Sequence, residues 1–236
     1  MYRLYIAAHG TVQTQRCNAK EDPPVVNKAD QAYDVLERMI TFQELPPGSL
    51  LSEARLMERT GLGRTPVREA LQRLARERMV DIHPSQGVFV APTSIEAQLK
   101  VLELRRSMEE LAVRLAALRA TTEQRERILA LAEVLGEFDG EDSKQFGELL
   151  KQTHTMIVEA AHNEYLSVAM APLQGLSRRF WFAHLRDPKV ELAEAADLHG
   201  GILRAICHGD QTKASEASLR LNDYLTDFTY RTLRNQ

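Results

Sequence analysis

The sequence is poor in cysteine, with only Cys17 and Cys207 among its 236 residues. Two cysteines make neither a disulfide framework nor a metal cluster. No apolar run approaches the ~20 residues that cross a bilayer. The N-terminal stretch also lacks the long apolar segment and small-residue cleavage site of a secretion signal. We therefore expect a cytoplasmic protein without a membrane-spanning segment.

Recognisable catalytic motifs are also missing. The sequence has no G-x-S-x-G, no phosphate-binding loop and no H-E-x-x-H. Cys207 and His208 are neighbours, but adjacent side chains on a helix point roughly 100° apart and do not form a nucleophile–base pair by themselves. We expect a protein that is not an enzyme.

The net charge is small and acidic, −3 from 30 basic and 33 acidic residues, which by itself disfavours a nucleic-acid partner. Its distribution is uneven. Residues 55–78 hold seven arginines and three glutamates, a net charge of +4, whereas residues 94–236 sum to −4. Positive charge is therefore concentrated in one short stretch, as expected of a nucleic-acid-binding face.

The chain divides into three parts. Residues 1–25 show no sustained period, and we interpret them as an N-terminal tail. Residues 26–93 contain an amphipathic helix over 28–42, a short helix opened by Ser52 and a third helix that begins near Thr65-Pro66. Two β-rich runs joined by a glycine-containing turn then predict a hairpin. These are the parts of a winged helix-turn-helix.

After Pro92 the sequence is dominated by alanine and leucine at helical spacing. We predict helices over 94–119, 122–138, 142–162, 164–185, 190–208 and 211–234. Six helices with short connections favour an all-α bundle over residues 94–236. The fold class is thus mostly α, with an N-terminal winged helix-turn-helix and a C-terminal helical bundle.

The third helix of the winged part is the expected DNA reader. Arg64 and Arg68 are four residues apart and share one face, opposite the apolar face of the same helix. A guanidinium fork suits bidentate contact with guanine or phosphate. The alternative is that these arginines only solvate an exposed face and pair with Glu69 or Glu77.

The motif RTPVREAL at 64–71, with Gly61 and the run Gly87-Val88-Phe89-Val90, resembles the GntR-type transcriptional regulators. That resemblance implies binding to double-stranded operator DNA. The family usually has serine before the first arginine, where this chain has Gly63. The residues that the resemblance assigns to DNA contact are Ser52, Arg64, Thr65, Arg68, Gln86 and Gly87.

The bundle resembles the all-α effector (FCD-like) domain of the FadR-type branch, on residues that include Thr153-His154 and Leu198-His199-Gly200. Many members hold a divalent metal there through an aspartate, a histidine four residues later and two further histidines. His154 and His199 match two of these places. The aspartate place is Leu150, and the last histidine place falls on Leu221 or Asn222. The metal site is therefore incomplete: no cofactor is assigned, and a divalent metal on His154 and His199 stays an open alternative.

The resemblance also implies a small carboxylate as effector. The candidate residues are Arg105, His154, His199 and Asn222, with Arg178 and Trp181 on one face of a further helix. Alternatively, the histidines are satisfied core residues, and Trp181 with its neighbouring phenylalanines is core or dimer packing.

We expect a homodimer on a roughly palindromic operator, because one winged domain makes too few base contacts for high specificity. Two other hypotheses stay open. One is a metal-dependent sensor of the same family, and the other is a regulator whose bundle only dimerises.

Overall fold

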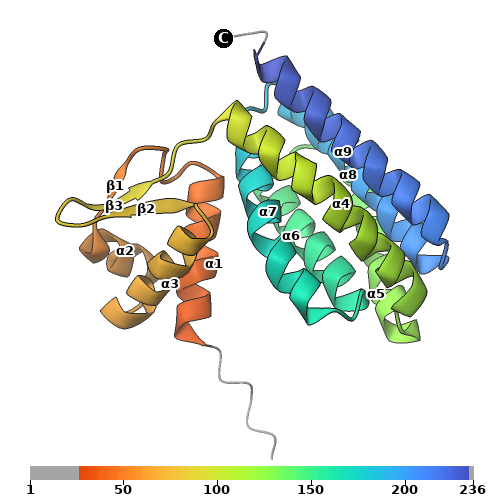
Figure 1. Cartoon of the computed structure of the whole chain (residues 1–236), viewed down its shortest axis with the longest axis horizontal. Helices are drawn as coiled ribbons and strands as arrows, with labels where there is room; N and C mark the ends of the chain where they lie inside the picture. Colours follow the sequence, from red (N-terminus) through yellow and green to blue (C-terminus); the bar gives the residue numbers. More distant parts are fainter. Residues whose placement is uncertain (1–26, 234–236) are drawn as a thin grey trace, which may run out of the picture.

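The computed structural model describes residues 27–233. The predicted tail over 1–25 lies outside the described residues. Figure 1 shows two parts side by side, a small mixed α/β part and a larger helical part. The mostly helical fold expected from the sequence is confirmed.

The small part, here called the winged domain, runs from the first helix to the last strand. Its elements are α1 (Lys28–Thr41), β1 (Leu50–Leu51), α2 (Glu53–Thr60), α3 (Arg64–Arg76), β2 (Val80–His83) and β3 (Gly87–Val90). The hairpin β2–β3 is as predicted. β1 was not predicted, and it pairs antiparallel with β3 to give the sheet order β1-β3-β2. A strand of two residues shows no alternation, so no periodicity reveals it.

The turns between these helices follow from their end residues. Ser52 occupies the N-cap position of α2 as predicted, and Gly61 ends the helix in the left-handed region at φ 68°, where glycine carries no steric cost. Gly63 then precedes α3 as its N-cap. Leu36, Leu56 and other buried apolar residues from all three helices and the sheet form one core.

The larger part, here called the bundle, contains six helices within the described range. They are α4 (Ile95–Arg119), α5 (Thr122–Gly136), α6 (Ser143–Ala160), α7 (Glu164–Ala183), α8 (Pro188–Cys207) and α9 (Gln211–Leu233). Each end lies within two residues of its predicted position, because polar N-caps such as Ser94, Thr121 and Asn163 begin the helices. Pro172 lies inside α7 and does not end it. No helix in the range described is long and apolar enough to cross a membrane.

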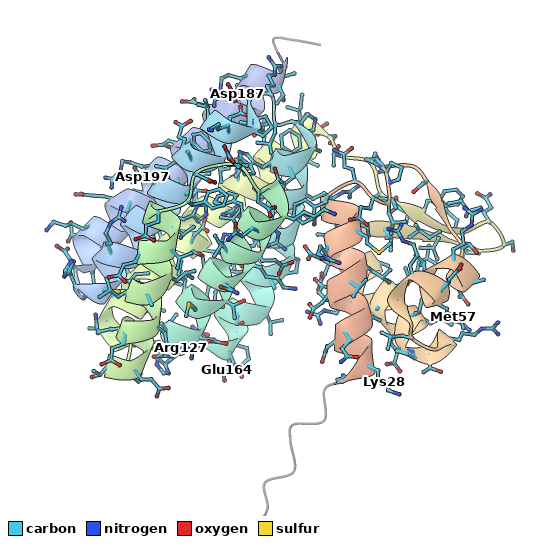
Figure 2. All side chains as sticks on the ribbon, turned by 180° about the vertical axis from the view of Figure 1, so that it is seen from behind. Lys28, Met57, Arg127, Glu164, Asp187 and Asp197 are labelled. Atoms are coloured by element: carbon cyan, nitrogen blue, oxygen red, sulfur yellow. The ribbon has the colours of Figure 1, made fainter. Side chains whose placement is uncertain are left out.

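α1 is the element through which the winged domain meets the bundle, as both Figure 1 and Figure 2 show. The ring of Phe42, just after α1, lies 4.8 Å from that of Phe182 in α7. Arg179 of the same helix donates a hydrogen bond to the carbonyl of Ala91, at the junction between the two parts. Met57 and the rest of α2 lie on the side away from the bundle. α3 packs against α1, α2 and β2 of its own domain, and its outer face is left open to an external partner.

Candidate functional site

The first turn of α3 presents the predicted DNA-contact residues to solvent. The side chains of Arg64 and Arg68 are 73 % and 61 % exposed, and Thr65 is exposed beside them. The opposite face of the helix is buried in the core. Because Gly63 supplies no side-chain cap, the helix start keeps free N–H groups and the positive end of its dipole. This turn therefore offers a positive, unobstructed surface to an anionic partner.

The arginines of this domain have separate roles. The Nε atoms of Arg64 and Arg68 lie 3.8 and 3.5 Å from the carboxylate of Glu53 in α2, and not against Glu69 or Glu77. Arg73 instead pairs with Glu77 at 3.1 Å and lies 3.7 Å over the ring of Tyr33 in α1. The first two are held loosely at the surface, whereas Arg73 joins α3 to α1.

The remaining predicted contacts flank α3. Ser52 is exposed and its hydroxyl makes no capping hydrogen bond, so it is free to bind an external group. Gln86 and Gly87 lie exposed at the tip of the β2–β3 hairpin. The turn reaches that tip through positive φ angles, 63° at Ser85 and 111° at Gly87. These three residues thus lie at the tip of the wing and at the start of α2.

A small cavity of about 20 Å³, here called the histidine cavity, lies within the bundle. Five of the six predicted effector residues line it: Arg105, His154, Arg178, Trp181 and His199. The other lining residues are Leu150, Ser177, Ala195, Leu221, Tyr224 and Leu225. Residues from five of the six helices therefore meet here, although they are distant in sequence.

Both histidines of the cavity are buried and neutral. Neither ring nitrogen of His154 has a hydrogen-bond partner, so it is not a satisfied core histidine. Burial, with the nearby Arg105, His199 and Arg178, holds the pKa of His154 well below its usual value. The Nδ1 atom of His199 lies 2.7 Å from the carbonyl of Ala195, and burial lowers the pKa of His199 to about 4.

The charge of Arg105 is balanced inside the bundle. Its Nη2 donates to both carboxylate oxygens of Glu109, one helical turn later, at 2.8 and 2.9 Å. Asn222 donates to the same carboxylate at 3.1 Å. Asn222 does not line the histidine cavity, because Leu221 takes that place and neighbouring side chains on a helix point in different directions.

Trp181 packs against neighbouring aromatic rings and also lines the cavity. It therefore has features of both interpretations of the sequence, core packing and contact with an effector. Its ring centroid lies 5.8 Å from that of Phe146, and its Nε1 donates to the Tyr224 hydroxyl at 3.3 Å. Burial raises the pKa of Tyr224 to about 12, so that hydroxyl stays protonated. The aromatic ring and the hydroxyl thus give the cavity one apolar and one polar wall.

Arg178, three residues before Trp181, makes a contact that the sequence did not suggest. Its Nη2 lies 2.5 Å from Oε1 of Glu37, in α1 of the winged domain. Both side chains are buried, 8 % and 5 % exposed. This is an ion pair between the two parts of the protein.

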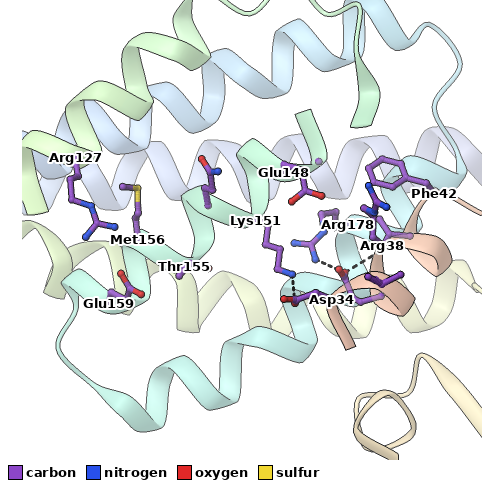
Figure 3. Close-up of a pocket in the computed structure, with 15 residues that line it drawn as sticks. Asp34, Arg38, Phe42, Arg127, Glu148, Lys151, Thr155, Met156, Glu159 and Arg178 are labelled. Atoms are coloured by element: carbon purple, nitrogen blue, oxygen red, sulfur yellow. Dashed lines mark hydrogen bonds and ion pairs between the residues drawn. The ribbon is translucent and has the colours of Figure 1, made fainter. Parts of the chain in front are cut away.

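A second, more open space of about 640 Å³, here called the interdomain groove, separates α1 from α6. Figure 3 shows Asp34 of α1 facing Lys151 of α6, an ion pair of 2.6 Å. Arg178 also lines this groove, so its side chain borders both spaces.

Comparisons with known proteins place these features in a family. The model of the bacterial regulatory proteins of the gntR family matches residues 28–90, and the FCD domain model matches residues 100–223. The chain belongs to the GntR family of transcriptional regulators and carries an FCD domain.

This regulator is similar to named repressors. It is 31 % identical over 192 residues to the HTH-type transcriptional repressor GlaR of Escherichia coli, covering 78 % of this chain and 87 % of GlaR. It is 27 % identical over 221 residues to the galactonate operon transcriptional repressor of the same species, covering 83 % and 94 %. E. coli McbR/YncC has the same fold, with a TM-score of 0.75, 21 % identity and coverage of 88 % and 99 %.

The residues of the cavity do not fit the metal that many members of the family hold. Leu150 and Leu221 occupy the places of two ligands, and a hydrocarbon side chain has no lone pair to donate. His154 and His199 alone leave zinc two ligands short of its usual four. Over residues 27–233, no group of three or more histidine, cysteine, aspartate or glutamate side chains is placed to hold an ion.

Sequence reasoning missed Glu37 and Ser177, and for Tyr224 it favoured a packing role over contact with a ligand. A signal for Glu37 was present, because it falls between Leu36 and Met39 on the apolar face of α1. An acid there requires a buried partner. Ser177 and Tyr224 carried no comparable signal, since they reach the cavity only through the packing of both α7 and α9 against α4.

Proposed function

We propose that this GntR-family regulator binds operator DNA as a homodimer and that a small organic acid in the histidine cavity changes its affinity for DNA. The observation that carries the effector proposal is the buried cavity itself. Two arginines, two neutral histidines and a tyrosine hydroxyl meet there, and both nitrogens of His154 have no partner. Buried polar groups without partners are rare in proteins and favour a ligand that supplies one.

The DNA contacts follow from exposure. We propose that Arg64, Thr65 and Arg68 enter the major groove, with Gln86 and Gly87 of the wing and the hydroxyl of Ser52 against the backbone. The first turn of the second helix of a helix-turn-helix is the usual reader of base edges. The wing and the cap of α2 flank that turn, where phosphates of the same duplex pass.

The dimer surface in this proposal is the outer face of α4. Leu104, Leu111 and Leu118 recur every seven residues and are 56 %, 47 % and 60 % exposed. Val101, Met108 and Leu115, half-buried, alternate with them at spacings of three and four. Two copies of such a row are complementary when the helices run antiparallel about a two-fold axis. A second copy of the chain is therefore the partner that this face fits.

The effector proposal is tested by isothermal titration calorimetry against acetate, malonate and galactonate, with neutral galactose as the control. Galactonate is included because a similar repressor is named for the galactonate operon. We expect at least one acid to bind at one site per chain and galactose not to bind. The same acid is expected to change affinity for a duplex selected from random sequence by binding to this protein.

A bundle that only dimerises is the second candidate. It is favoured by the volume of the cavity, about 20 Å³, which holds about one water molecule. Under this alternative no acid of the panel binds and none shifts the unfolding temperature. The dimer, in contrast, still forms.

A further inference from the structure

We propose that Arg178 links the histidine cavity to the winged domain: a carboxylate bound in the cavity competes with Glu37 for the Arg178 guanidinium and thereby releases α1 from the bundle. The inference rests on the effector site proposed above and assigns its regulation. Arg178 borders both the cavity and the interdomain groove, and its partner Glu37 belongs to α1.

Of the two arginines in the cavity, only Arg178 reaches the other domain. Arg105 pairs with Glu109, which lies on the same helix and is held in addition by Asn222. An anion that displaced Glu109 would change contacts only within the bundle. An anion that displaced Glu37 would change the contact between the domains.

The energetic reason for release lies in the burial of Glu37, which is 4 % exposed. Burial alone would raise the pKa of Glu37, but Arg178 and its hydrogen bond outweigh that effect, and the pKa is lowered. Once a ligand carboxylate takes Arg178, Glu37 keeps the 3.1 Å hydrogen bond from Thr41 on its own helix and the attraction of Lys151, which is already paired with Asp34. A buried charge without its partner is strongly unfavourable, and moving α1 toward solvent relieves it.

The volumes of the histidine cavity and the interdomain groove are consistent with a change of partner at Arg178, from Glu37 to a ligand carboxylate. The cavity of about 20 Å³ is too small for an organic acid and must widen. The adjoining groove of about 640 Å³ opens to solvent and shares Arg178 as part of its wall. Rotation of that one side chain away from Glu37 joins the two spaces.

The ion pair between Lys144 and Glu44 also joins the domains, but it is more exposed than the Arg178–Glu37 pair and lies apart from the cavity. Lys144 pairs with Glu44 at 2.9 Å, with side chains 62 % and 30 % exposed. Exposed pairs of this kind contribute little to stability. Glu44 lines neither the cavity nor the groove, so E44Q removes the ion pair with Lys144, together with that to Arg59 of α2 at 2.7 Å, without touching the proposed link.

The experiment compares the wild type with E37Q and the control E44Q. Titration with malonate and galactonate is followed by calorimetry and by the fluorescence of Trp181, the single tryptophan, which lines the cavity. Without a competing carboxylate, E37Q is expected to bind the acid about tenfold more tightly than the wild type. E44Q is expected to bind as the wild type does.

Hydrogen exchange supplies a second readout, measured first without ligand and then with the acid added. The amides of α1 in E37Q are expected to exchange faster than in the wild type and E44Q, and addition of the acid is expected to accelerate them only in the wild type and E44Q.

Each result decides between the proposals. Equal acid affinity in the wild type and E37Q overturns the competition while the effector site stands. If E37Q and E44Q both bind the acid more tightly than the wild type, and by the same factor, the competition is also overturned. A general loosening of the contact between the domains then explains the gain in affinity. If neither acid binds any of the three proteins, the effector proposal fails, and this inference fails with it.

Discussion

Individual arginines of the winged domain have different roles because their surroundings differ. Arg64 and Arg68 are largely exposed, and both face the single carboxylate of Glu53. Arg73 is 40 % exposed and lies between Glu77 and the ring of Tyr33. The stretch with a net charge of +4 therefore contains both residues available to DNA and residues that join helices.

Replacing Arg64 or Arg68 with alanine is expected to weaken binding to a selected operator by about 1–3 kcal/mol for each variant, if the side chain reads a base. Competition binding on the selected duplex and on a scrambled duplex measures the loss. Arg204→Ala, an exposed arginine of α8, is the matched control and is expected to leave affinity unchanged. Unchanged affinity in both α3 variants would contradict the assignment of this helix.

The two buried histidines make stability depend on pH. Their pKa values are lower in the folded than in the unfolded chain, so the unfolded state binds more protons as the solution becomes acidic. The free energy of unfolding is thus expected to fall from about pH 6.5 to about pH 4. The loss from His199 alone is on the order of 2–3 kcal/mol.

Urea denaturation at several pH values measures this slope. The groups that face the histidines are Arg105 of α4, Arg178 of α7 and Glu109 of α4, and all belong to ion pairs. His154→Gln is expected to flatten the slope. A slope identical to that of the wild type would show that His154 is not held neutral by the fold.

At the scale of elements, α4 serves two surfaces. One side carries Arg105, Glu109 and the buried core positions, and the other carries the row of exposed leucines. A helix that is apolar on both sides is expected to be covered on both. The bundle covers one side, and a second chain is the proposed cover for the other.

Leu111→Glu is expected to convert the proposed dimer to a monomer, because it places a charge in the middle of the leucine row. Sedimentation velocity measures the change, and operator affinity is expected to fall with it. Leu129→Glu in α5, at a leucine of similar exposure outside the row, is the control and is expected to remain dimeric. A dimer that persists in Leu111→Glu would place the interface elsewhere.

At the scale of the whole molecule, Gly147 of α6 sets how closely the two domains approach. A Cβ atom at this position would lie 2.4 Å from Cζ of Phe42, whose ring packs against Phe182. Without a side chain at this position, the ring of Phe42, which follows α1, can lie against α6.

Gly147→Ala is expected to lower the stability of the domain contact by about 1–3 kcal/mol through overpacking. Gly201→Ala in α8 is the control, because no atom lies within 4 Å of the added methyl group. Its higher helix propensity is expected to stabilise the bundle by about 0.5–1 kcal/mol. Thermal unfolding and protease cleavage near residues 91–94 measure both effects, and equal behaviour of the two variants would contradict the role of Gly147.

Local order was accessible from the sequence because it depends on neighbours along the chain. Apolar spacing, polar N-caps such as Ser94 and Thr121, and the glycine at Gly61 placed the helices and the hairpin within two residues. The candidate reader α3 was found in the same way, since its motif is contiguous. The strand β1 was missed because its two residues gain order only by pairing with β3.

The sequence by itself determined the mostly helical fold, the order of its elements and the concentration of arginines on one helix. Only the tertiary structure decided which candidates meet. It brought Arg105, His154, Arg178, Trp181 and His199 to one cavity and placed Asn222 outside it. It also joined Arg178 to Glu37, 141 residues away. Such pairings depend on how helices pack in three dimensions, and no periodicity along one helix encodes the partner that another helix brings.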